Sequence, residues 1–121
     1  MLLEDHADSR EVLVHALRVA GAAVTAFGAA KDAFAALEQV RPSVIVADVG
    51  LPDEDGYSFM RRVRSCATAS IQSVPAIAVT AYATAADQAK ARVSGFQQHV
   101  PKPIAPAQLV EMIYELTRRP T

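Results

Sequence analysis

The sequence has few of the features that mark secreted, membrane-spanning or nucleic-acid-binding proteins. It contains a single cysteine, Cys66, so an internal disulfide is impossible and a reducing compartment is favoured. Its 12 basic and 13 acidic residues give no electrostatic basis for binding nucleic acid or an anionic membrane. No apolar run approaches the roughly 18 residues of a membrane span, and the N-terminus lacks the pattern of a signal peptide. We therefore expect a cytoplasmic protein with no nucleic-acid or membrane partner.

Glycine-rich phosphate-binding loops of the two common patterns are also missing, which argues against a nucleotide enzyme. What the sequence does have is the composition of a globular protein. Apolar residues make up 51% of its 121 positions and charged residues 21%. A chain of this length can bury a core without disulfides or metal staples, so residues 1–121 are expected to form a single domain.

Short apolar runs alternate with segments of helical periodicity along the whole chain. In the last such segment, for example, Leu109, Met112, Ile113 and Leu116 fall on one helix face. The pattern predicts an α/β fold, a doubly wound five-stranded parallel sheet with helices on both faces. The expected strands are 2–3, 23–27, 43–47, 76–80 and 97–100, and the expected helices are 8–20, 31–41, 57–66, 84–94 and 106–118.

Polar side chains stand where four of the predicted strands end. Glu4 and Asp5 follow the first strand, Asp48 the third, Thr80 ends the fourth, and the fifth runs into Lys102. In open parallel sheets, the carboxyl ends of the strands share one edge, and ligands bind there near a topological switch point. The sequence therefore predicts a site of three carboxylates, a hydroxyl and an ammonium.

The residue types at this edge indicate phosphoryl chemistry. Clustered carboxylates favour a hard cation, and Mg²⁺ accepts a few protein oxygens while it keeps several waters. A carboxylate beside such an ion can act as a nucleophile on phosphorus. The ammonium and the hydroxyl are then suitable donors to the phosphoryl oxygens.

Four motifs together resemble the receiver domain of two-component response regulators. They are the acidic pair Glu4-Asp5, "DVGLPDEDGY" at 48–57, "VTAYA" at 79–83 and "PKP" at 101–103. The likeness covers nearly all of the chain, and "GFQQHVPKPI" at 95–104 is similar to receivers of hybrid histidine kinases. The resemblance implies a flavodoxin-like (βα)5 fold and a signalling protein rather than an enzyme.

The resemblance also implies roles for individual residues. Asp48 would accept a phosphoryl group from the phosphohistidine of a histidine kinase. Asp5 would bind Mg²⁺ directly together with Asp48 and the backbone carbonyl of Gly50, and Glu4 would bind it through water. Lys102 would pair with Asp48 or with the phosphoryl group.

Further implied roles concern the surroundings of the phosphoryl group and the output. Thr80 would donate its hydroxyl, helped by the backbone N–H of Ala81, and Pro103 would be a cis-proline. His99 stands where the family usually has a switching Tyr or Phe. Tyr82 would shield the path of hydrolytic water and slow self-dephosphorylation. Phosphorylation would change the surface of 84–94, 97–100 and 106–118, which would bind an unidentified downstream protein.

Two other functions share parts of this pattern. A Mg²⁺-dependent phosphohydrolase of haloacid-dehalogenase type also forms an aspartyl phosphate, but it needs a second Asp where this chain has Gly50. A flavodoxin-like flavin-binding protein needs a Ser/Thr-rich loop after the first strand, and that loop is absent. Whether the chain is a stand-alone regulator or part of a hybrid kinase stays open.

Several charged residues near the predicted site are interpreted as ordinary surface groups. Asp53 and Glu54 are expected to be solvated loop acids, and Asp55-Gly56 a turn. The arginines of helix 57–66 are expected to form a solvated face. His6 is interpreted as an exposed histidine and not as a metal ligand.

Overall fold

The computed structural model describes residues 1–81 and 84–118. Helices and strands alternate through these residues, as the sequence predicts, except that α4 follows α3 directly. The elements are β1 (Leu2–Leu3), α1 (Ala7–Val19), β2 (Ala26–Phe27), α2 (Ala30–Val40), β3 (Ile45–Asp48), α3 (Gly56–Arg64), α4 (Ala69–Gln72), β4 (Ala76–Thr80), α5 (Ala85–Ser94), β5 (Gln98–Pro101) and α6 (Pro106–Thr117).

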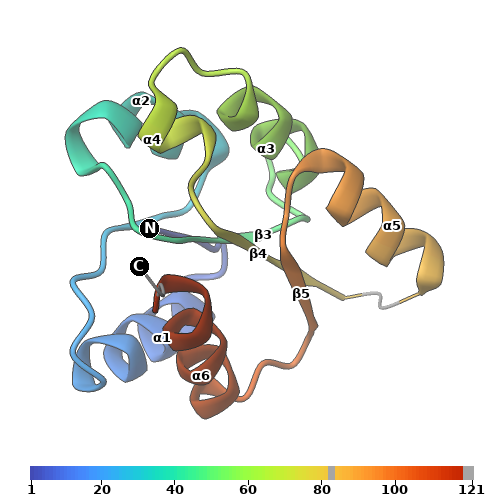
Figure 1. Cartoon of the computed structure of the whole chain (residues 1–121). Helices are drawn as coiled ribbons and strands as arrows, with labels where there is room; N and C mark the ends of the chain where they lie inside the picture. The colour runs from blue at the N-terminus through green and yellow to red at the C-terminus, as the bar shows by residue number, and fades with distance from the viewer. Residues whose placement is uncertain (82–83, 119–121) are drawn as a thin grey trace.

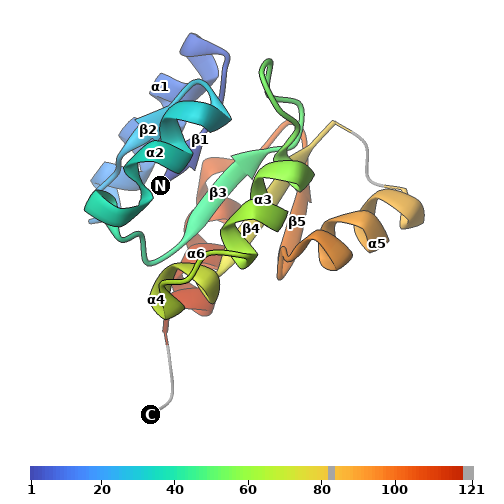
Figure 2. The same cartoon turned by 90° about the horizontal axis from the view of Figure 1, so that it is seen from above.

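Within the described residues the strands form a five-stranded parallel sheet in the order β2-β1-β3-β4-β5. The order confirms the predicted doubly wound fold of flavodoxin-like type. From β1 the chain adds β2 on one side and then β3, β4 and β5 on the other, so the topological switch point lies between β1 and β3. Figures 1 and 2 show α1 and α6 on one face and α2, α3 and α5 on the other. None of the helices in residues 1–81 and 84–118 is long and apolar enough to span a bilayer.

Alternation along the strands divides the core into two clusters. Ile45 and Ala47 belong to the cluster under α2 and α3, which includes Phe59, whereas Val46 belongs to the cluster under α1 and α6. Strands β3 and β4 are buried at every position, as expected for the middle of a sheet that is covered on both faces. This packing fixes the carboxyl ends of the central strands β3 and β4, where polar groups can then be held in place.

The loop after β3 closes on itself and starts α3. Asp55 caps the helix, because its carboxylate accepts the backbone N–H of Ser58 at 2.7 Å. The N–H of Gly56 donates to the carbonyl of Val49 at 2.9 Å, which brings the two backbones together. A Cβ at position 56 would lie 2.8 Å from both the Asp48 carbonyl oxygen and Val49 Cα, so only glycine fits this approach. These two residues therefore start a helix, with Asp55 as its N-cap and Gly56 as its first residue, and do not form the separate turn that the sequence predicts.

Most element bounds differ from the sequence prediction by one or two residues, and two differences are larger. The predicted strand 23–27 pairs only at Ala26–Phe27, because its partner β1 is two residues long and limits the ladder. The short helix α4 has no counterpart in the prediction. It is a single turn stabilised by burial of Ile71, too short to produce a periodic apolar pattern.

Candidate functional site

Strand register places three charged residues on the same side of the sheet edge. Leu3 is paired with Ala47, so the next residues, Glu4 and Asp48, leave their strands side by side. Glu4, Asp48 and Lys102 each stand two positions beyond a residue of the α1/α6 core cluster, which contains Leu2, Val46 and Val100. Because side chains alternate along a strand, these three point toward the same face. The predicted convergence at the carboxyl ends of the strands is therefore observed.

Asp48 is buried, with 4% of its surface exposed, and both of its carboxylate oxygens are engaged. One oxygen accepts a hydrogen bond from Lys102 Nζ, and the other accepts the backbone N–H of Gly50 at 2.8 Å. Burial by itself raises the pKa of Asp48, but the bonds from Lys102 and Gly50 outweigh it and hold the pKa below its ordinary value. Asp48 is consequently ionised at neutral pH and held in one position.

Glu4 lies beside Asp48 and is buried as deeply, with 5% of its surface exposed. Burial first, and then the neighbouring Asp48 carboxylate, raise the pKa of Glu4 from 4.5 to about 7. Lys102 Nζ is 3.9 Å from one Glu4 oxygen and is shared between the two acids. Burial would lower the pKa of Lys102, but its bond to Asp48 raises the pKa above the ordinary value.

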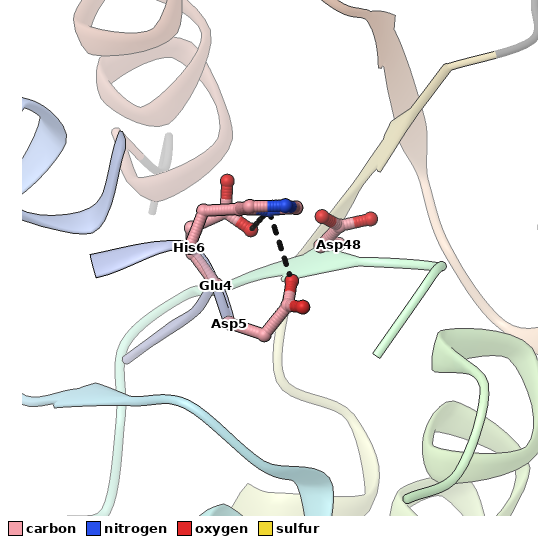
Figure 3. A group of neighbouring side chains, drawn as sticks. All are labelled: Glu4, Asp5, His6 and Asp48. Carbon is pink, nitrogen blue, oxygen red and sulfur yellow. Dashed lines mark ion pairs between the residues drawn. The ribbon is translucent and has the colours of Figure 1, made fainter. Parts of the chain in front are cut away.

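Glu4 and Asp5 each keep one buried oxygen without a hydrogen-bond donor, Glu4 Oε2 and Asp5 Oδ1. Figure 3 shows the side chains of Glu4, Asp5, His6 and Asp48 gathered at one place, and each offers a ligand atom within 4.8 Å of the others. Unsatisfied carboxylate oxygens at this density favour a bound cation, because hard divalent ions take oxygen ligands. The residues present therefore fit a Mg²⁺ site.

The remaining predicted residues lie around this acidic cluster. Thr80 is buried at the end of β4, and its carbonyl accepts the backbone N–H of Lys102 at 2.7 Å. Ala81 follows it and is exposed. The Lys102–Pro103 peptide bond is cis, as predicted. His99 is half-buried on β5, and Tyr82 lies outside the described residues.

A family model described as "Response regulator receiver domain" matches residues 1–114. The chain belongs to this family. Its members are signalling phosphoacceptors, and receivers are partners of histidine kinases. The match over residues 1–114 decides against a haloacid-dehalogenase phosphohydrolase and a flavin-binding protein.

Individual receivers and related proteins support the assignment. An uncharacterised 14.6 kDa protein in the sodA1 3′ region of Leptolyngbya boryana is 36% identical, over 95% of this chain and 86% of that protein. The receiver domain of the sensor histidine kinase PA1611 from Pseudomonas aeruginosa PAO1 is 31% identical, with a TM-score of 0.84 over 96% of this chain and 94% of the other. That structure holds a magnesium ion coordinated in its active-site cleft.

The fold is shared more widely than the sequence. Chemotaxis protein CheY4 of Vibrio cholerae is 23% identical and has a TM-score of 0.88, over 95% of this chain and 94% of that one. Two transcriptional regulatory proteins with 34% identity are longer, and this receiver spans 48% and 51% of their lengths. The activities of those longer proteins are therefore not transferred to this chain.

The two loop acids predicted to be solvated also make structural contacts: Asp53 is exposed, as predicted, and Glu54 is half-buried. Asp53 accepts the backbone N–H groups of Ala30 and Lys31 at 3.0 and 2.9 Å and so caps the start of α2 from a distant loop. Glu54 accepts hydrogen bonds from Ser58 at 2.8 Å and from Arg62. Nothing in the sequence near 53 and 54 marks these partners, because they depend on how the loop folds over α2 and α3.

The arginines of α3 agree with the predicted solvated face except for Arg64. Arg62 is exposed, but its guanidinium stacks 4.0 Å above the ring of Phe34. Arg64 is half-buried and donates to the carbonyls of Gly95 and Gln72, which ties α3 to the end of α5 and to α4. Arg61 is exposed, as expected.

The raised pKa of Glu4 predicts a pH dependence of stability in metal-free protein. A carboxyl group whose pKa rises from 4.5 to about 7 on folding binds its proton more tightly in the folded state. Its contribution is therefore fully present below pH 4.5 and is lost as pH rises through about 7. Urea unfolding in EDTA should show that Glu4→Gln becomes more stable relative to wild type, by up to a few kcal/mol, between pH 5 and pH 8.

The matched control is Glu11→Gln, which changes an exposed carboxylate on α1. Its stability relative to wild type should stay nearly constant over the same interval. A Glu4→Gln curve that runs parallel to that of wild type would contradict the raised pKa.

Proposed function

We propose that this receiver accepts a phosphoryl group from the phosphohistidine of a histidine kinase onto Asp48, with Mg²⁺ bound by the neighbouring acids. The observation that carries the proposal is the state of Asp48. Its carboxylate is buried at the end of β3 and oriented by Lys102 and Gly50, beside two acids with unpartnered oxygens. The shared fold with receivers and the magnesium ion in the PA1611 receiver support the same reading.

In the proposed step, a carboxylate oxygen of Asp48 attacks the phosphorus of the phosphohistidine. The new O–P bond forms as the N–P bond breaks, and the electron pair of that bond stays on the imidazole nitrogen of the kinase. Lys102 Nζ, which already contacts Asp48, follows the transferred group and donates to a phosphoryl oxygen. The Thr80 hydroxyl and the Ala81 N–H supply the other donors in this proposal.

The phosphoryl group brings nearly two negative charges to a place that already holds Glu4 and Asp5. Like charges about 4 Å apart repel by roughly 1 kcal/mol in water and several-fold more where solvent is partly excluded. One ammonium, that of Lys102, does not offset this repulsion. Bound Mg²⁺ supplies charge neutralisation and polarises the phosphoryl oxygens. We propose that Asp5, Asp48 and the Gly50 carbonyl hold it directly and that Glu4 holds it through water.

The output is proposed to pass through the surface of α5, β5 and α6. Lys102 lies one residue beyond β5, and its backbone N–H is bonded to the end of β4, so a shift of its ammonium is transmitted along two strands. Val93 on α5 and Tyr114 on α6 are exposed large apolar side chains of these elements. His99 on β5 occupies the proposed switch position, and Tyr82 keeps its proposed shielding role. A cytoplasmic location follows from the proposed kinase partner.

The proposal predicts stoichiometric, metal-dependent modification. Intact-mass spectrometry after incubation with acetyl phosphate and Mg²⁺ should show a gain of one phosphoryl group, about 80 Da, the mass of HPO₃ carried by an aspartyl phosphate. EDTA should abolish the gain because the repulsion between the acids and the phosphoryl group is no longer offset. Asp48→Asn should abolish it because the nucleophile is gone.

Asp53→Asn is the matched control, since it alters an acid of the same loop that caps α2 rather than facing the site. It should be modified like wild type. Full modification of Asp48→Asn would place the phosphoacceptor elsewhere and refute the assignment.

A second prediction separates phosphorylation from switching. Lys102→Ala removes the cation that contacts the carboxylate, so phosphorylation should no longer reach β5. In ¹H–¹⁵N spectra, acetyl phosphate with Mg²⁺ should shift the amide signals of Val93, His99 and Tyr114 in wild type and much less in the variant. Lys31→Ala, which alters an exposed lysine on α2, should behave like wild type. Equal shifts in Lys102→Ala and wild type would remove Lys102 from the switch.

A further inference from the structure

The imidazole of His6 lies beside the two buried oxygens that have no hydrogen-bond donor. His6 Nδ1 is 3.4 Å from Asp5 Oδ1 and 4.0 Å from Glu4 Oε2. The His6 side chain is 71% exposed, as the sequence suggests, and Figure 3 shows its ring nitrogen turned toward the acids. The His6 ring nitrogen therefore lies beside both oxygens that lack a donor.

The separations match those of ligands around one transition-metal ion. Neighbouring ligand atoms of a tetrahedral ion with bonds of about 2.1 Å lie about 3.4 Å apart, which equals the distance between His6 Nδ1 and Asp5 Oδ1. The four candidate ligand atoms, those of Glu4, Asp5, His6 and Asp48, all lie within 4.8 Å of one another. Binding to one tetrahedral centre requires the separations between these atoms to shorten by up to about 1.4 Å.

The burial of Glu4 is a second observation that points to a bound ligand, separate from the clustering of acids. Its side chain is 7% exposed and Oε2 has no donor, although the pocket also contains the Lys102 ammonium. A buried carboxylate oxygen without a partner costs free energy unless a cation or a donor is present. His6 Nδ1, at 4.0 Å, is too far to donate a hydrogen bond to this oxygen. An ion between the two satisfies both atoms.

We infer that His6 is a nitrogen ligand in this site, and that the site therefore binds late first-row divalent ions such as Zn²⁺ in preference to Mg²⁺. Imidazole suits Co²⁺, Ni²⁺, Cu²⁺ and Zn²⁺, whereas Mg²⁺ is bound almost entirely through oxygen. The inference rests on the proposed function for the role of Asp5 and Asp48 as shared metal ligands. It adds that His6 raises the affinity of the site for Zn²⁺ relative to Mg²⁺. Zn²⁺ then competes with Mg²⁺ for the metal site beside Asp48.

Calorimetric titration of the whole protein with Zn²⁺ and, separately, with Mg²⁺ tests the inference. His6→Asn removes the imidazole but keeps a residue suited to begin α1, and His6→Ala is a second variant. In both, Zn²⁺ affinity should fall about tenfold or more, since loss of even an outer partner of a metal ligand costs about 10–100-fold. The ratio of Zn²⁺ to Mg²⁺ affinity should fall with it. His15→Ala, which alters an exposed histidine on the same helix, should bind Zn²⁺ like wild type.

The ¹⁵N chemical shifts of the imidazole nitrogens test direct metal binding by His6. Zn²⁺ would not change them if His6 had only a structural role. Zn²⁺ should shift the ring nitrogens of His6 and leave those of His15 and His99 in place. An unchanged Zn²⁺ to Mg²⁺ ratio in both His6 variants, or Zn²⁺ shifts at other histidines alone, would overturn the inference. Phosphorylation of the wild-type protein with Mg²⁺ is measured in a separate experiment. If it fails, the proposed function is refuted, but a Zn²⁺ site that depends on His6 is not.

Discussion

The structure depends on keeping ionised carboxylates at the end of an apolar sheet. Asp48 follows three fully buried residues and is itself buried, so its charge is stable only because Lys102 and the Gly50 N–H contact it. The same ammonium is the one cation within 4 Å of Glu4 among the described residues other than His6. A single lysine thus holds two buried acids, and an added phosphoryl group must compete for it. In the proposed function, that competition would be the physical basis of the switch.

The pairing of the strands determines where these charged side chains lie. Parallel pairing of β1 with β3 sets Glu4 beside Asp48, and pairing of β4 with β5 brings Lys102 to the same edge. The Gly56 backbone packs against Asp48 and Val49, and Asp55 starts α3 at once, so the loop has little freedom. Rigid neighbours keep the carboxylate in one orientation, which is what a phosphoryl acceptor needs.

Much of this could be predicted from the sequence, because strand ends in a parallel sheet share an edge and residue type alone then indicates the chemistry. The convergence of Glu4, Asp48 and Lys102 was predictable on that ground. The contacts of Asp53 with α2 and of Arg64 with Gly95 were not, since partners 22 to 31 positions away depend on tertiary packing. The orientation of His6 toward Asp5 likewise depends on how the chain turns between β1 and α1.

The central claim is that Asp48, and not a neighbouring acid, carries the phosphoryl group. Borohydride reduces an acyl phosphate to an alcohol and so converts a phosphorylated aspartate to homoserine, while free carboxylates do not react. Tandem mass spectrometry of the reduced and digested protein, after phosphorylation by a histidine kinase or acetyl phosphate, locates that residue. The account predicts homoserine at position 48 alone. Homoserine at position 5, 53 or 55, with position 48 unchanged, would contradict it.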